Sequence, residues 1–154
     1  RDYYQAVKGL SAGTYINGLH LGEWTNTGPT MYVWMRLLWN PDLDVDAVLD
    51  EMCKRLYGKA GGTAREFIRL QCALWQDGPW KNRRVKNRGA WGVPEHLFPR
   101  VWTPDVAQRL KALRDQALTE LAGDALARQR FLYWTWSFDA FVKEAGTLHG
   151  KKEE

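Results

Sequence analysis

The sequence predicts a mainly α-helical fold with one strand near its beginning. Beyond residue 40, apolar residues recur every three or four positions, which is the period of an amphipathic helix. Only residues 13–17 combine β-branched and aromatic side chains between glycines, a pattern typical of a strand. The chain has 154 residues, 45% of them hydrophobic, enough for one sizeable core. We therefore expect a compact folded chain.

The first 39 residues indicate the order helix, strand, loop, helix. A short helix is expected over residues 2–8 and the strand over 13–17, followed by a long polar and aromatic loop at 18–28. Pro29 is favoured in the first turn of a helix, so a helix is expected over residues 30–39. This helix is apolar nearly all round, and we expect it to be buried.

A single strand cannot satisfy its own backbone hydrogen-bonding groups. It must pair either with a partner chain or with strands that precede Arg1 in a longer protein. The first residues have the character of a helix interior, without an initiator methionine, which favours the second alternative.

From residue 40 onward every predicted element is a helix. Residues 40–44 offer caps for a helix over 45–57, and Thr63 with Glu66 forms a capping box for a helix over 63–76. Residues 78–102 form a long loop, and Thr103 caps a helix that runs to about residue 121. The last predicted helix follows Asp124 and has a clean apolar stripe. Its members are Ala127, Phe131, Trp134, Phe138, Phe141, Ala145 and Leu148.

The sequence has two cysteines and nine tryptophans. Cys53 and Cys72 fall on consecutive helices, at positions too far apart for a disulfide. Their spacing is not that of a metal site, and we expect no metal and no cofactor. Four tryptophans are expected to pack between helices: Trp34, Trp39, Trp75 and Trp134.

The net charge of +4 is concentrated in one segment. Residues 81–88 hold five positive charges, and the rest of the chain is close to neutral, which argues against a broad nucleic-acid footprint. With Trp80 and Trp91 beside it, the basic segment is open to three interpretations: a solvated loop, which we favour, a site for acidic sugars, or a nucleic-acid site. No apolar run is long enough to span a membrane.

Residues 32–46 and 56–60 carry a recognisable pattern. A tyrosine-containing helix ends in Leu-Trp-Asn-Pro, an aspartate-rich cap follows, and the next helix ends in Tyr-Gly. The Arg128-Gln129-Arg130 start of an aromatic helix also fits. In this the chain resembles a family of mainly bacterial proteins with a glycosidase-like (β/α)8 barrel and a helical C-terminal region, long labelled a domain of unknown function. Some members are similar to endo-β-N-acetylglucosaminidases or α-glucuronidases.

The resemblance implies the fold and domain organisation in more detail. Residues 1–39 would be the end of a barrel, with its last strand and helices, residues 40–150 a C-terminal helical bundle, and residues 151–154 a tail. The acidic catalytic residues would lie on earlier strands, so they are unknown here and the isolated chain is not expected to be active. The partners implied are an oligosaccharide or polysaccharide and the remainder of the same barrel. Members of such a family are usually exported, although no signal sequence is visible.

The loop after the predicted strand would then lie on the catalytic face of the barrel. The Trp24 indole would stack on a sugar ring while the Glu23 carboxylate accepts hydrogen bonds from its hydroxyl groups, a pair called the sugar platform below. Alternatively, Trp24 is simply a buried indole and Glu23 a surface carboxylate. His20 would contact substrate or only donate a structural hydrogen bond. Asn17 would bind a hydroxyl or cap the turn, and Tyr15 would line the pocket or fill the barrel.

The sequence therefore predicts the C-terminal portion of a glycoside hydrolase, supplying substrate-wall residues and a helical scaffold. A non-catalytic carbohydrate-binding or structural helical domain is the first alternative. A nucleic-acid-binding helical module is the second and the less favoured.

Overall fold

The computed structural model describes residues 1–10, 24–77, 103–136, 138–139 and 142–143. Within these ranges the elements are all helical and no strand occurs. They are α1 (Asp2–Ala6), α2 (Trp24–Trp39), α3 (Val45–Tyr57), the 3-10 helix η2 (Gly58–Ala60), α4 (Gly61–Asp77), α6 (Pro104–Glu120) and α7 (Ala125–Trp134). The mainly α prediction is confirmed. The predicted strand at 13–17, and with it the barrel remnant, lies outside the described residues.

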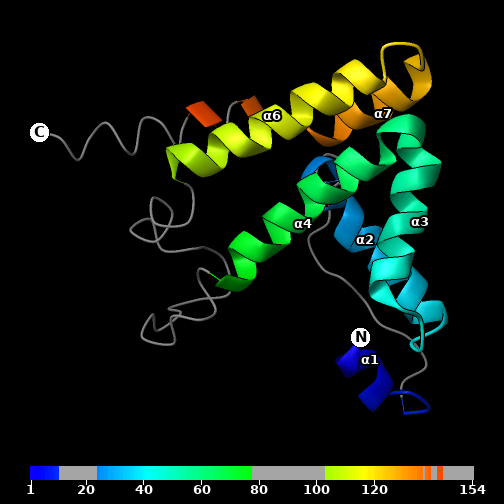
Figure 1. Ribbon diagram of the computed structural model, residues 1–154. Coiled ribbons are helices and arrows are strands. Elements are labelled where there is room, and N and C mark those ends of the chain that lie inside the picture. Colours follow the sequence, from blue (N-terminus) through cyan, green and yellow to red (C-terminus); the bar gives the residue numbers. More distant parts are fainter. Residues whose placement is uncertain (11–23, 78–102, 137, 140–141, 144–154) are drawn as a thin grey trace, which may run out of the picture.

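The helices form a bundle centred on α3. This helix packs against α2, α4 and α7, while α4 also packs against α6 (Figure 1). The short helix α1 has no buried residue and lies at the edge of the bundle, where Lys8 forms an ion pair with Asp42. This hydrogen bond from Lys8 holds the pKa of Asp42 below its usual range.

Aromatic side chains form the centre of the core. Phe131 of α7 is fully buried, and its ring meets Tyr57 edge-on at 5.4 Å and Trp134 at 5.6 Å between centroids. Trp134 stacks on Tyr57 at 5.6 Å, and Phe67 of α4 packs edge-on against Trp134 at 5.4 Å. Three helices are therefore joined through one cluster. The apolar stripe predicted for the last helix is confirmed at residues 127, 131, 134 and 138, and its members Phe141, Ala145 and Leu148 lie outside the described residues.

Capping residues fix most helix boundaries where the sequence predicts them. The side chain of Asp44 accepts a hydrogen bond from the Asp46 amide at 2.9 Å, which starts α3. Thr103 does the same for α6, and Asp124 for α7. Gly58 ends α3 with φ of +47°, a conformation that glycine adopts without strain.

The predictions for residues 18–39 need two corrections. The helix begins at Trp24 and not at Pro29, so part of the predicted loop is helical and Pro29 lies inside α2. Trp39, expected to pack, is 93% exposed, and only Leu37 of the 30–39 segment is fully buried. The physical reason is that, among the described elements, α2 packs mainly against α3 and α7, and these contacts leave Trp39 uncovered.

The uncovered side of α2 is called its outer face below. It consists of Met35, Leu38 and Trp39, which are 56%, 39% and 93% exposed. None of these side chains is charged, and the single charged residue of α2, Arg36, points to α3, where it pairs with Glu51 at 3.2 Å.

The predicted capping box at Thr63 and Glu66 is wrong. The chain enters α4 directly from η2, so α4 begins at Gly61 and Thr63 already lies within it. The Thr63 hydroxyl donates instead to the Glu120 carboxylate at 2.8 Å, and Glu66 pairs with Arg69. The last helix is also shorter than predicted: α7 ends at Trp134, and helical residues return only at 138–139 and 142–143 within the described residues.

The two cysteines are free, as predicted, but their environments differ: Cys53 is 1% exposed in the core and Cys72 is exposed. Burial raises the pKa of the Cys53 thiol from 9.0 to about 11, and burial likewise raises the pKa of Tyr57. Both groups must stay neutral in the folded chain, whereas in the unfolded chain the thiol ionises from about pH 9.

We therefore expect full stability below about pH 9 and a progressive loss as the pH rises through 11. Urea denaturation at pH 7.5, 9 and 10.5 measures this. In parallel, a thiol reagent at pH 8 should label the exposed Cys72 in the native chain and Cys53 only on unfolding. Equal labelling of both thiols in the native chain would show that Cys53 is not buried.

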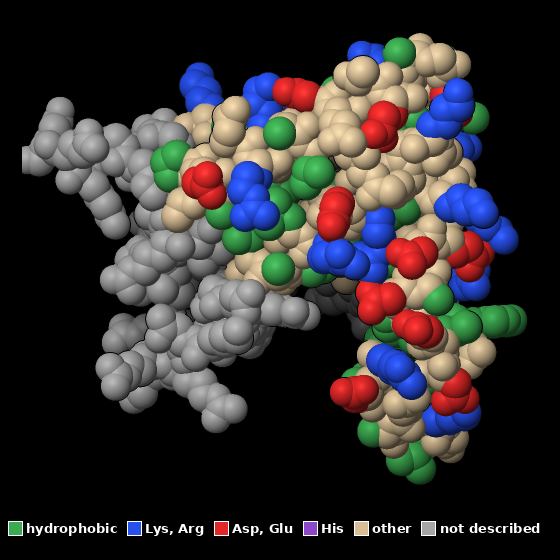
Figure 2. Space-filling model, in the orientation of Figure 1, with side chains coloured by type: hydrophobic (Ala, Val, Ile, Leu, Met, Phe, Trp, Pro, Cys, Tyr) green, Lys and Arg blue, Asp and Glu red, His purple; other side chains and the backbone are tan. Residues whose placement is uncertain are grey.

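Charges on the front of the molecule are of mixed sign. Figure 2 shows Lys and Arg side chains interleaved with Asp and Glu over the described helices on this face, without a broad field of one sign. An extended basic surface of the kind that binds nucleic acid is therefore absent from the described part of this face. The basic segment 81–88 lies outside the described residues.

Candidate functional site

The site predicted from the sequence falls mostly outside the described residues. Tyr15, Asn17, His20 and Glu23 all lie in the range 11–23, and Trp24 is the first residue of α2, with its side chain outside the description. The predicted sugar platform therefore stays a prediction. The chain does place it directly before α2, the helix that carries the exposed outer face.

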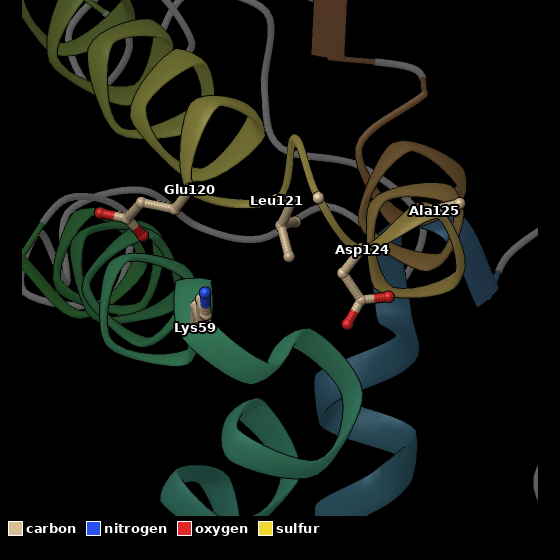
Figure 3. A pocket seen from close by; sticks show the side chains of 6 residues that line it. Lys59, Glu120, Leu121, Asp124 and Ala125 are labelled. Carbon is tan, nitrogen blue, oxygen red and sulfur yellow. The ribbon is translucent and has the colours of Figure 1, made fainter.

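Within the described residues, a polar hollow lies where α6 turns into α7. It has a volume of about 340 Å³. Figure 3 shows Glu120 and Asp124 on either side of Leu121, with Lys59 of η2 below Glu120. Its remaining lining is Leu121, Gly123 and Ala125.

Both carboxylates of this hollow have structural partners. Asp124 accepts from the Ala127 amide at 3.0 Å and so caps α7. Glu120 accepts from the Thr63 hydroxyl and, at 2.8 Å, from the Gln116 side chain. Glu120 therefore ties α6 to α4 and Asp124 caps α7, so both carboxylates are engaged in the structure of the bundle.

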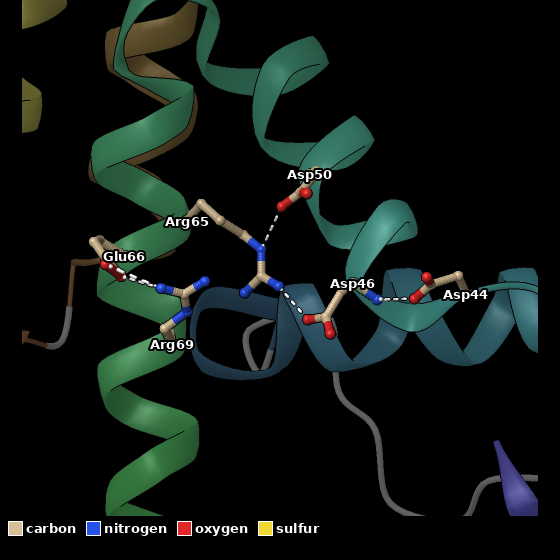
Figure 4. Close-up of polar contacts among 6 residues, drawn as sticks. All are labelled: Asp44, Asp46, Asp50, Arg65, Glu66 and Arg69. Carbon is tan, nitrogen blue, oxygen red and sulfur yellow. Dashed lines mark hydrogen bonds and ion pairs between the residues drawn. The ribbon is translucent and has the colours of Figure 1, made fainter.

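A second polar cluster ties the start of α3 to α4. Figure 4 shows Arg65 reaching from α4 to the carboxylates of Asp46 and Asp50 on α3. The distance from Nε of Arg65 to Oδ1 of Asp50 is 2.7 Å, and the arginine side chain is only 14% exposed. Burial alone would lower the pKa of Arg65, but the hydrogen bonds to Asp50 and Asp46 raise it, so the guanidinium stays charged.

A third tie joins α6 to the residues that follow α7. Arg114 donates to Oδ1 of Asp139 at 2.9 Å and to the Thr135 hydroxyl at 3.3 Å, and its guanidinium lies 5.8 Å from the centre of the Phe138 ring. All three clusters therefore connect elements of the bundle.

The described residues contain no group of three or more His, Cys, Asp or Glu side chains that could hold a metal ion. Nor do they include a helix that is long and apolar enough to cross a membrane. Four of the described carboxylates, Asp44, Asp50, Glu120 and Asp124, act as caps or helix ties, as described above.

One surface was missed by the sequence argument. Leu126 and Tyr133 of α7 are 57% and 51% exposed, and Trp136, just after the end of this helix, is 68% exposed. The apolar stripe at 127, 131 and 134 predicted only the buried side of the helix, and no function was predicted for the aromatic residues outside that stripe. For Tyr133 the available signal was its position two residues after Phe131, because residues two apart in a helix do not share a face.

Comparison with known proteins gives one match. Residues 3–69, which cover α1 to the first half of α4, match a family described as "Domain of unknown function (DUF4838)". The matched range includes both segments on which the sequence resemblance depends, 32–46 and 56–60. No curated protein and no solved structure matches the chain.

Proposed function

We propose that this chain is the C-terminal part of a carbohydrate-active enzyme of the glycoside hydrolase type. In the proposal the segment 13–24 forms one wall of the sugar site, and α2 to α7 form a helical scaffold behind it. The family match over residues 3–69 supports the recognition of a domain, and the sugar chemistry is inferred from the resemblance. Export of the whole protein belongs to the same proposal.

The observation that carries the scaffold role is the outer face of α2. An exposed helix of a globular protein normally shows polar side chains to water, but Met35, Leu38 and Trp39 are uncharged and all three are exposed, Trp39 almost completely. A helix that is apolar on both sides is typical of one lying between two layers. In a (β/α)8 enzyme the helices of the outer ring have this position, between the strands and whatever covers the ring.

The polar chemistry of the described helices agrees with a supporting role. Arg65, Arg114 and Glu120 each join two parts of the bundle, which leaves them unsuited to bind and release a substrate. The proposed sugar contacts are therefore the predicted ones, Trp24 above all, and the acids that cleave the glycosidic bond would belong to earlier strands.

A titration of the 154-residue chain tests the sugar contact. We expect neutral oligosaccharides to change its tryptophan fluorescence, and Trp24→Ala to abolish most of that change because the stacking ring is lost. Trp39→Ala is the matched control: it removes an exposed tryptophan from the outer face of α2 and should leave the sugar affinity unchanged.

Short DNA in the same assay separates the proposal from the nucleic-acid alternative. Tight DNA binding that falls steeply with salt, without a sugar response, would overturn the proposal in favour of phosphate contacts by residues 81–88. A sugar response that Trp24→Ala leaves intact would remove Trp24 from the site.

A further inference from the structure

A glycine and a proline lie together inside α2. Pro29 is the sixth residue of this 16-residue helix, and Gly28 directly precedes it. Proline has no amide hydrogen, and inside a helix its ring crowds the carbonyl group four residues earlier, here that of Thr25. Glycine adopts helical and extended backbones with little difference in strain. The pair divides α2 into two parts, which are called the entry turn (residues 24–28) and the main part (residues 29–39) below.

The two parts differ in helix propensity and in their contacts. The entry turn has the sequence Trp-Thr-Asn-Thr-Gly, in which every residue is a weak helix former, and no acidic side chain in the first turn supports the helix dipole. The main part contains strong helix formers, which are Met31, Met35, Arg36, Leu37 and Leu38. It is also attached to the bundle, because Leu37 is buried and Arg36 pairs with Glu51 of α3. The main part can therefore stay helical without the entry turn.

The same proline favours a second start for α2. Proline is preferred at the first position of a helix, where no amide hydrogen is needed, and Gly28 would then be the capping residue. In α-helical geometry each amide bonds to the carbonyl four residues earlier, so a helix that begins at Trp24 has three hydrogen bonds that the shorter one lacks. Their donors are the amides of Gly28, Thr30 and Met31. The shorter helix gains the backbone entropy of the entry turn in exchange.

We propose that the entry turn of α2 is an order–disorder switch with its hinge at Gly28. In one state α2 begins at Trp24, as in the structure, and in the other it begins at Pro29 while the main part stays helical. The hydrogen bonds of the longer helix are opposed by five weak helix formers and by a proline at an interior position. The two states therefore lie close enough in free energy for a ligand to shift their populations.

The choice of a sugar as the ligand that acts on this switch rests on the proposed function. Trp24, the proposed stacking residue, is the first residue of the entry turn. When the entry turn is helical, the backbone of Trp24 is held at a fixed place relative to the main part, and when the turn unwinds that place is lost. A sugar that stacks on Trp24 therefore binds the helical state more tightly and increases its population.

Hydrogen exchange of single amides, followed by NMR on the 154-residue chain, tests the switch. From Tyr32 onward the amides are hydrogen-bonded in both states, whereas those of Thr30 and Met31 are bonded only when the entry turn is helical. We therefore expect a step in protection: Thr30 and Met31 should be at least about tenfold less protected than Tyr32 and Val33. Equal protection on both sides of this step would overturn the switch.

Two substitutions should shift the switch toward the longer helix. Pro29→Ala removes the residue that favours the shorter helix and should raise protection at Thr30 and Met31 at least about tenfold. Thr27→Ala, within the entry turn, should raise protection at Met31 about two- to threefold, because alanine is the better helix former. Thr30→Ala is the matched control: it makes the same replacement at an exposed residue that is helical in both states, and should leave protection at Met31 unchanged. Equal effects of Thr27→Ala and Thr30→Ala would show that α2 has no hinge at Gly28.

The same exchange measurement with a saturating neutral oligosaccharide tests the coupling to the ligand. We expect protection at Thr30 and Met31 to rise on binding, and Pro29→Ala to bind the sugar about twofold more tightly, because the helical state is then already populated. If the sugar binds through Trp24 and protection does not change, the coupling is wrong. If the sugar binds and the step in protection is absent, the switch falls and the proposed function stands. If no oligosaccharide binds, the proposed function and the coupling both fall, and the step in protection decides between one helix start and two.

Discussion

Replacing Phe131 by alanine should destabilise the chain by about 3–5 kcal/mol, the usual cost of deleting a fully buried aromatic ring. At roughly 2–4 °C per kcal/mol for a chain of this size, the melting temperature should fall by about 10 °C. Helical circular dichroism during heating measures this change. Near-ultraviolet circular dichroism should weaken as well, because the ring lies among other aromatic side chains.

The effect is large because Phe131 connects three helices. Its ring is 0% exposed and meets Tyr57 of α3, Phe67 of α4 and Trp134 of its own helix, the last two at 6.5 Å and 5.6 Å between centroids. Bulky rings held in fixed stacking cannot close around an empty ring-sized space, so the cavity persists. Trp134 would also lose the edge contact that positions it on Tyr57.

The control is Leu126→Ala on the same helix. Leu126 is 57% exposed, so its loss should change the free energy of unfolding by no more than about 0.5 kcal/mol. If both variants had similar melting temperatures, α7 would not be packed through Phe131. A loss above about 2 kcal/mol for Leu126→Ala would instead indicate that the Leu126 side chain is covered in solution.

The boundaries of α3 show what a sequence can predict. Asp44 is a residue that accepts amide hydrogen bonds at a helix start, and Gly58 is one that tolerates positive φ at a helix end. Both signals depend on a few neighbouring residues and not on distant parts of the chain. The same holds for Thr103 at the start of α6.

Predictions that depended on distant contacts were less successful. Thr63 and Glu66 have the spacing of a capping box, but the chain already turns helically through η2, and Glu120 from α6 takes the hydroxyl. Trp39 belongs to an apolar helix, and an apolar pattern cannot say on how many sides a helix is covered. The exposed side of α7 was missed for a related reason, since the regular buried stripe accounted for the helix by itself.

Gly61 and Gly62 are adjacent in α4, and we expect opposite effects when each is replaced by alanine. A Cβ at Gly61 would lie 3.1 Å from the carbonyl oxygen of Cys53 and 3.2 Å from Cα of Lys54. Both atoms belong to the backbone of α3, which cannot move aside as a flexible side chain can. Gly61→Ala should therefore destabilise the chain by about 1–3 kcal/mol, the usual cost of overpacking.

Nothing lies within 4 Å of a Cβ at Gly62, which is exposed at the second position of α4. Gly62→Ala should be neutral or stabilise by about 0.4–1 kcal/mol, because alanine restricts the unfolded chain and favours the helix. Urea unfolding of the two variants and the parent measures both values. A stabilising Gly61→Ala would show that α4 does not start in contact with α3.

The comparison isolates the packing of α4 on α3. Both substitutions add one methyl group, and both gain helix propensity by about the same amount. The difference between the free energies of unfolding of the two variants therefore measures the effect of the close approach at Gly61, because the change in backbone entropy is about the same in both. Gly61 directly follows the Gly58 turn and the single turn of η2, which form the short connection between α3 and α4. A large difference in stability between the two variants would therefore mean that this connection sets the angle between α3 and α4. That angle in turn brings Arg65 to Asp46 and Asp50, so Gly61→Ala should also weaken this ion-pair cluster, whereas Gly62→Ala should leave it intact.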